Sequence, residues 1–98
     1  MAEWLCLLRP PRQTFVDDMT EDEAAIMRDH FRYLETLLAD GALVLAGPSL
    51  GPVFGVCVFE AEDEEAAKAL AAADPSVTAG LQTAELSPFR VSLLRGRD

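Results

Sequence analysis

The sequence is poor in cysteine and contains no paired-cysteine motif. Its two cysteines, Cys6 and Cys57, are far apart in the chain, and each lies inside a short apolar segment. A dense disulfide framework and the usual cysteine-rich zinc motifs are therefore excluded. We expect two reduced, buried thiols. A disulfide between them would require their two segments to form neighbouring strands.

Long apolar runs and clusters of basic residues are also missing. No apolar run approaches the ~18–20 residues that a membrane span needs, and the N-terminus lacks the basic and apolar regions of a signal peptide. The chain has 17 acidic and 8 basic residues, a formal net charge of −9. This charge disfavours nucleic acids and anionic membranes as partners. We expect a cytoplasmic protein that binds neither.

Histidine occurs once, at position 30, which argues against a metal site. One histidine without paired cysteines cannot supply the three or four ligands of a usual zinc site. The acidic residues at 17–23 lack the spacing of a calcium loop. The glycines at 47 and 51 are not followed by the lysine and helix of a phosphate-binding loop. We therefore expect neither a metal nor a cofactor.

The composition is that of one ordinary globular domain. The chain has 98 residues, of which 50% are hydrophobic and 26% are charged, so we expect a single domain over residues 1–98. A chain of this size buries only about 60–65% of the surface that its unfolded form exposes. Pairing with a second copy would enlarge this thin core.

Capping signals and apolar spacing predict two helices. Thr20 and Glu23 form a capping box that begins a helix over 21–40, whose apolar positions recur every three or four residues. Gly41 follows as a C-terminal cap. Asp63 is expected to cap a second helix, which ends before Pro75.

Short apolar segments predict four strands at 4–8, 42–46, 53–59 and 82–86. The segment 9–19 is expected to be a long loop, 47–52 a turn region, and 77–80 a single turn. Gly55 indicates a bulge or a close-approach point. Pro88 is expected to end the last strand, and 89–94 to continue along the sheet edge.

The order β-α-β-β-α-β predicts an α+β, ferredoxin-like fold, in which both helices cover one face of an antiparallel sheet. The other face would stay uncovered. Burial of an apolar uncovered face against a second copy of the chain predicts a homodimer.

The chain also resembles the YCII-related family in motifs that occur in the same order over nearly its whole length. The motifs are His30–Leu34 leading to Gly41, Ala46-Gly47-Pro48, Ala73-Asp74-Pro75 with Ala79-Gly80, and Glu85–Phe89. The segment 9–15 resembles a subgroup that carries this loop. The resemblance implies a dimeric α/β barrel, related in architecture to muconolactone isomerase. It also implies an active site centred on a histidine and an aspartate, which correspond to His30 and Asp74. Some members are linked to dehydrochlorination of chlorinated aromatic diols.

His30 and Asp74 are also candidates on physical grounds. A histidine on an apolar helix face needs a partner for at least one ring nitrogen, and Asp74 follows the second helix, which covers the same sheet. A carboxylate bonded to one nitrogen fixes the tautomer and leaves the other nitrogen to act as a general base or acid. Two alternatives remain open: His30 as a satisfied core residue, and Asp74 as a cap on the turn at 77–80.

Arg12 and Phe15 in the long loop are the candidate ligand-binding residues. The arginine could bind a carboxylate or phenolate, and the ring could cover a pocket. Alternatively, Arg12 is a surface residue and Phe15 anchors the loop.

These features predict a small-molecule enzyme of isomerase or lyase type, in which His30 and Asp74 transfer a proton. The alternative is a non-catalytic module for small-ligand binding or assembly.

Overall fold

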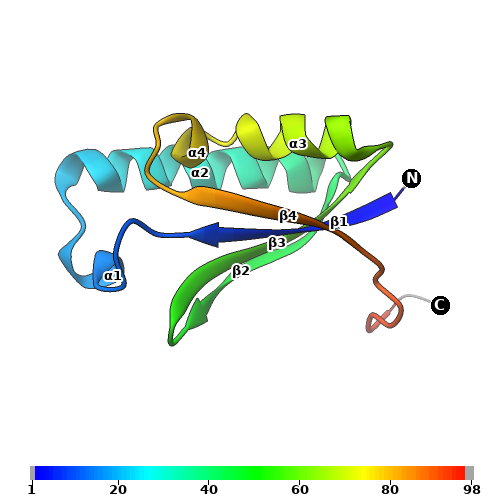
Figure 1. Ribbon diagram of the computed structural model, residues 1–98, viewed down its shortest axis with the longest axis horizontal. Helices are drawn as coiled ribbons and strands as arrows, with labels where there is room; N and C mark the ends of the chain where they lie inside the picture. The colour runs from blue at the N-terminus through cyan, green and yellow to red at the C-terminus, as the bar shows by residue number, and fades with distance from the viewer. Residues whose placement is uncertain (1, 97–98) are drawn as a thin grey trace.

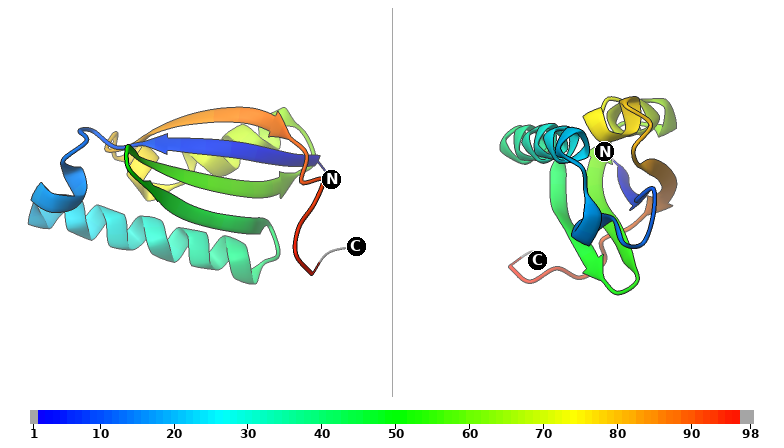
Figure 2. Two further views of the ribbon diagram at one scale, coloured as in Figure 1. Left: turned by 90° about the horizontal axis from the view of Figure 1, so that it is seen from below. Right: turned by 90° about the vertical axis from the view of Figure 1, so that its left-hand side faces the viewer.

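A four-stranded antiparallel sheet, covered on one face by helices, forms the body of the computed structural model, which describes residues 2–96 (Figure 1). The elements are β1 (Ala2–Arg9), α1 (Phe15–Asp18), α2 (Glu21–Ala39), β2 (Leu43–Leu50), β3 (Val53–Ala61), α3 (Glu64–Ala72), α4 (Pro75–Thr78) and β4 (Thr83–Phe89). The strand order is β2-β3-β1-β4. The end-on view shows the two long helices, α2 and α3, side by side on the sheet (Figure 2). The predicted ferredoxin-like arrangement is confirmed.

The two edge strands are longer than the sequence predicts. β2 continues past position 46 to Leu50, and β4 continues through Pro88 to Phe89, so the predictions of a turn over 47–52 and of a break at Pro88 are wrong. The reason is their place in the sheet. Pro48 and Pro88 lie in edge strands, where a residue without an N–H group costs no ladder hydrogen bond on its outer side.

Local signals located the helices well, with two corrections. The side chain of Thr20 accepts from the Glu23 N–H and begins α2, and Asp63 caps α3. The loop predicted over 9–19 contains the short helix α1, and the turn predicted at 77–80 begins earlier, as α4. Asp74 as cap and Pro75 at the first helical position explain that earlier start.

Side chains facing the helices form the core. Trp4, Cys6 and Leu8 of β1 are buried against α2 and α3. Gly55 is a point of close approach as expected, because a Cβ atom there would lie 3.3 Å from Leu8 Cβ. Cys6 and Cys57 are direct partners on neighbouring strands, and both are free. Burial raises the pKa of these thiols to about 11 and about 12, so both stay protonated at neutral pH.

The opposite face of the sheet, called the open face, is not covered by helices. Side chains alternate along a strand, so Leu5 and Leu7 of β1 point away from the core, beside Val58 and Val56 of β3. On the edge strand β2, Leu45 lies next to Val58 and is 41% exposed. The centre of the open face is therefore apolar.

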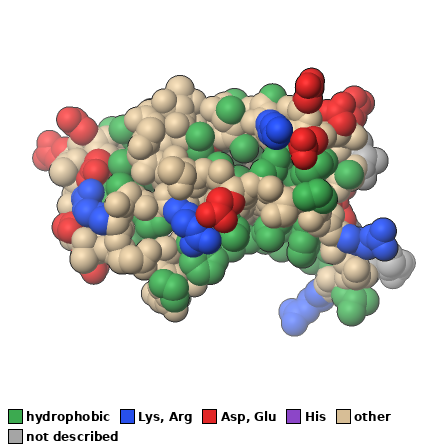
Figure 3. Space-filling model, viewed as in Figure 1, with side chains coloured by type: hydrophobic (Ala, Val, Ile, Leu, Met, Phe, Trp, Pro, Cys, Tyr) green, Lys and Arg blue, Asp and Glu red, His purple; other side chains and the backbone are tan. Residues whose placement is uncertain are grey.

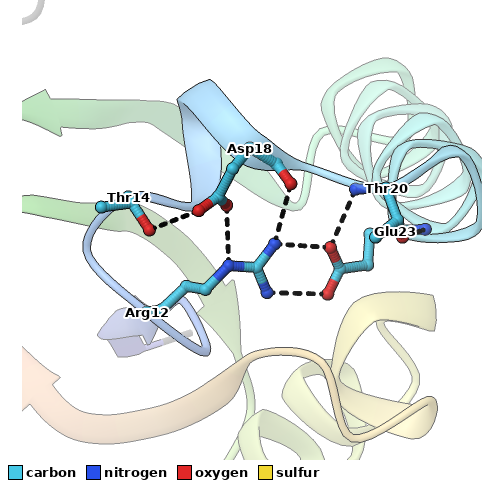
Figure 4. Close-up of polar contacts among 5 residues, drawn as sticks. All are labelled: Arg12, Thr14, Asp18, Thr20 and Glu23. Atoms are coloured by element: carbon cyan, nitrogen blue, oxygen red, sulfur yellow. Dashed lines mark hydrogen bonds and ion pairs between the residues drawn. The ribbon is translucent and has the colours of Figure 1, made fainter.

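Arg12 ties the segment after β1 to α2 (Figure 4). Its guanidinium donates to Asp18 Oδ1 at 2.7 Å and makes two parallel hydrogen bonds to the Glu23 carboxylate, at 3.0 and 2.8 Å. Glu23 Oε1 also accepts from the Thr20 N–H at 3.0 Å, which completes the predicted capping box. One carboxylate thus begins α2 and anchors the loop that precedes it.

Gln13 holds the same segment to the β2–β3 hairpin. Its side-chain amide donates to Val53 O at 3.0 Å and accepts from Val53 N–H at 2.8 Å. Together, Arg12 and Gln13 fix α1 at the end of the sheet where β1 ends and the hairpin turns (Figure 1).

The Arg12–Glu23 pair makes the stability of the protein depend on pH in the acid range. Hydrogen bonds from Arg12 and then from the Thr20 N–H lower the pKa of Glu23 to about 2, against about 4.3 in an unfolded chain. A lowered pKa stabilises the fold above the unfolded value, and that contribution is lost as pH falls through the folded value. We predict that Glu23→Gln flattens the fall in free energy of unfolding between about pH 5 and pH 2.

Urea denaturation at several pH values measures this effect. Glu21→Gln, on the neighbouring exposed glutamate of the same helical turn, is the matched control and should follow the wild-type curve. Parallel curves for Glu23→Gln and wild type would contradict the role given to the ion pair.

Candidate functional site

His30 lies near the middle of α2, on the face that packs on the sheet. Met27, Leu34 and Leu37 share this face at helical spacing, and His30 is only 9% exposed. An imidazole in such surroundings needs hydrogen bonds to offset the water that it loses. The partner predicted for it, Asp74, is in place.

Asp74 serves two elements with its two carboxylate oxygens. Oδ2 lies 2.7 Å from His30 Nδ1, and Oδ1 accepts from the N–H and the hydroxyl of Ser76, each at 2.9 Å. The second contact makes Asp74 the N-cap of α4. Both roles considered for Asp74 are therefore met by the same residue, which is 3% exposed.

This arrangement fixes the tautomer of His30. An ionised carboxylate only accepts hydrogen bonds, so Nδ1 carries a proton and donates it to Asp74 Oδ2. Neutral His30 then has its lone pair on Nε2. Within residues 2–96, the one fully buried side-chain nitrogen or oxygen without a partner is Trp4 Nε1. His30 Nε2 is not among these atoms, and His30 borders a space between the helices and the sheet.

That space is a cavity of about 410 Å³. Its walls come from β1, α1, the middle of α2, and the β2–β3 hairpin. Among the described residues that line it, only His30 and Gln82 carry a side-chain nitrogen or oxygen. An engineered apolar cavity of about 150 Å³ already binds benzene, so this one has room for a substituted ring. Its apolar walls with few polar groups are typical of ligand sites.

Phe15 lines this cavity and Arg12 does not. The Phe15 ring is 2% exposed, so it anchors the loop and also forms part of the cavity wall. Arg12 lies over that ring at 5.4 Å, with its guanidinium bound to Asp18 and Glu23. The structure thus brings His30, Asp74 and Phe15 together and places Arg12 behind the wall.

Two residues of the site, Ser76 and Gln82, were not singled out from the sequence. Ser76 is fully buried, and its Oγ lies 2.9 Å from both Asp74 Oδ1 and Gln82 Oε1. The Asp-Pro-Ser order, which is typical of a helix N-cap, was a usable signal for Ser76. No local pattern marks Gln82, because its contact with Ser76 depends on the path of the chain around α4.

The described residues show no site of other kinds. Residues 2–96 contain no group of three or more histidine, cysteine or acidic side chains placed to hold a metal ion. In the same part of the chain, no helix has the length and apolarity to cross a membrane.

Comparison with known proteins agrees with this fold. No curated protein matches the chain. A solved structure that matches is TftG from Burkholderia phenoliruptrix AC1100, a 5-chloro-2-hydroxyhydroquinone dehydrochlorinase in complex with 2,5-dihydroxybenzoquinone. The two share 21% identity over 89% of this chain and 93% of TftG, with a TM-score of 0.66. The model of the YCII-related domain matches residues 3–90. This protein therefore belongs to the YCII-related family.

Proposed function

We propose that this protein is a small-molecule enzyme in which His30 is the general base or acid and Asp74 orients it. The observation that carries the proposal is one arrangement: Nδ1 of the single histidine is bound to a buried carboxylate, and the same ring lines a cavity of ligand size. Histidine changes charge near neutral pH, which suits it to proton transfer.

The proposed step uses both members of the pair. Neutral His30 takes a proton at Nε2 from a ligand hydroxyl or an acidic C–H group. Asp74 stabilises the imidazolium that forms, as the carboxylates of catalytic triads do. The same nitrogen then returns the proton to another atom of the ligand, in an isomerisation, or to a departing group, in an elimination.

The fold neighbour supports the choice of ligand class. TftG is a dehydrochlorinase of a chlorinated, hydroxylated ring and was solved with a dihydroxybenzoquinone. A hydroxylated six-membered ring also suits the cavity here, since its flat faces would contact apolar walls and one hydroxyl would meet His30. We therefore propose hydroxylated aromatic or quinone-like rings as ligands.

The open face of the sheet supports a homodimer. Figure 3 has the orientation of Figure 1 and shows hydrophobic side chains gathered along the lower side, under the sheet. Leu5, Leu7 and Leu45 lie on this face, and a second copy of the same face would cover them. Self-complementary pairing of this kind gives a two-fold dimer, the barrel that the family resemblance implies.

We predict that 2,5-dihydroxybenzoquinone binds in the cavity beside His30. NMR titration of ¹⁵N-labelled protein measures the binding, because the single histidine gives one set of ring signals. Ala46 lines the cavity, so Ala46→Trp should fill it and abolish binding. Leu38→Trp, on an exposed part of α2, is the control. Binding that Ala46→Trp leaves unchanged would place the ligand site elsewhere.

We predict that Asp74→Asn lowers turnover about 10²- to 10⁴-fold, the usual contribution of general acid–base catalysis. In this variant the Ser76 N–H still donates to the oxygen of the new side-chain amide. The NH₂ group of that amide therefore faces His30 Nδ1. The imidazole proton is thereby moved to Nε2, where the base is needed.

Chloride release from 5-chloro-2-hydroxyhydroquinone is the assay. Asp63→Asn is the matched control, because Asp63 caps α3 through the Ala66 N–H at 2.8 Å and takes no part in the site. Equal turnover by Asp74→Asn and wild type would contradict proton transfer by the pair.

We predict a dimer at micromolar concentration, with twice the 10.6 kDa mass of one chain. Leu5→Glu places a charge in the apolar centre of the open face and should give monomers, because a buried unpaired charge is costly. Leu38→Glu, on an exposed part of α2, should stay dimeric. Sedimentation velocity distinguishes the two states, and a monomeric wild type would refute the proposal.

A further inference from the structure

Gln82 joins the buried hydrogen-bond network to the cavity. It lies between α4 and β4, where its backbone N–H donates to Ser76 O at 3.0 Å. Gln82 is 7% exposed, its Oε1 atom lies 2.9 Å from Ser76 Oγ, and the residue lines the cavity together with His30. One end of this amide therefore belongs to the network, and the other end is available to a ligand.

The number of protons in the network decides which end of the Gln82 amide, Nε2 or Oε1, lies next to Ser76. Ser76 Oγ lies 2.9 Å from Asp74 Oδ1 and 2.9 Å from the Gln82 amide, but a hydroxyl has one proton to donate. The charged carboxylate oxygen is the stronger acceptor and has no proton of its own. The structure places Gln82 Oε1 at 2.9 Å from Ser76 Oγ, but the proton count favours the exchanged orientation of this amide, in which the Ser76 hydroxyl donates to Asp74 and accepts from Gln82 Nε2. This orientation of the amide gives every member of the network a partner.

The oxygen of the Gln82 amide is then turned toward the cavity. Gln82 contributes no atom to the fully buried, unpartnered atoms of residues 2–96, so this outer end is open. The cavity thus presents two acceptors, Gln82 Oε1 and His30 Nε2, within otherwise apolar walls.

We propose that Gln82 is a substrate-positioning residue that accepts a hydrogen bond from a second donor group on the ligand. The ligand then carries a hydroxyl or N–H group for Gln82 in addition to the proton that His30 removes. This inference rests on the proposed function, because it assumes that the ligand occupies the cavity beside His30. Contacts with both His30 and Gln82 would fix the orientation of the ligand ring, and so determine which of its atoms faces His30.

The test is binding of matched probes to the full-length chain. Catechol, resorcinol and hydroquinone each carry two hydroxyls in a different arrangement. The corresponding fluorophenols keep one hydroxyl and replace the other by fluorine, which cannot donate. NMR titration gives the dissociation constants, with the ring signals of His30 reporting occupancy of the cavity.

We expect at least one benzenediol to bind about 2- to 12-fold more tightly than its fluorophenol, the range that one net hydrogen bond supplies. Gln82→Met keeps the length of the side chain and should abolish that preference while fluorophenol binding persists. Leu38→Met, on an exposed part of α2 outside the cavity, should retain it. A preference that survives Gln82→Met, or no preference in the wild type, overturns the inference and leaves the role of His30 intact.

Two further readouts keep the test decisive. If Gln82→Met does not fold, Ser76→Ala removes the anchor of the amide at almost constant volume and should reduce the same preference.

The chain has no asparagine, so its two glutamines give the only side-chain amide signals. The Gln82 NH₂ protons should exchange with water more slowly than those of Gln13, and faster exchange would contradict the proposed orientation. If none of the six probes shifts His30, both the cavity as ligand site and this inference fail.

Discussion

The hydrogen bond between His30 Nδ1 and Asp74 Oδ2 connects the two halves of the helical layer. His30 comes from the middle of α2, and Asp74 from the junction of α3 and α4. The same carboxylate begins α4, so the position of the histidine partner is fixed by a helix cap as well as by the histidine. A carboxylate that is held from both sides keeps its orientation when a ligand arrives. Such preorganisation is what a proton-transfer site requires.

The directions of the other hydrogen bonds around Asp74 follow from the small number of protons that its partners can donate. Asp74 can only accept, which fixes the proton on His30 Nδ1 and also the direction of the Ser76 hydroxyl. In the proposed site, these two directions leave His30 Nε2 and one end of the Gln82 amide for a ligand in the cavity that both residues line. The sheet separates this site from the open face, where Leu5 and Leu7 lie. One face of the sheet thus supports the site, while the other is available for pairing with a second copy.

Local signals in the sequence were sufficient for the two long helices, whereas the pairing of His30 with Asp74 was also suggested by the family resemblance. The capping box at Thr20 and the spacing around His30 depend only on neighbouring residues, and Asp74 follows from its place before a proline. The lengths of β2 and β4 could not be predicted in the same way. Pro48 and Pro88 break a central strand but are tolerated at an edge, and edge position is a property of the whole sheet.

The role of Arg12 was equally hard to predict from the sequence. An arginine in a long loop predicts an anion site, but acidic residues nearby in the chain compete with any ligand, and Asp18 and Glu23 bind it in the structure. Ser76 and Gln82 show the complementary limit. Serine and glutamine form hydrogen bonds in any environment, so their part in the site became visible only with the path of the chain around α4.

The central claim is that His30 presents a bare Nε2 to the cavity because Asp74 holds the proton of Nδ1. A long-range ¹H–¹⁵N spectrum of the ring, recorded at a pH where His30 is neutral, measures this directly, since the chain has one histidine. The account predicts a protonated Nδ1 and an unprotonated Nε2. A proton on Nε2 in the neutral ring would contradict it.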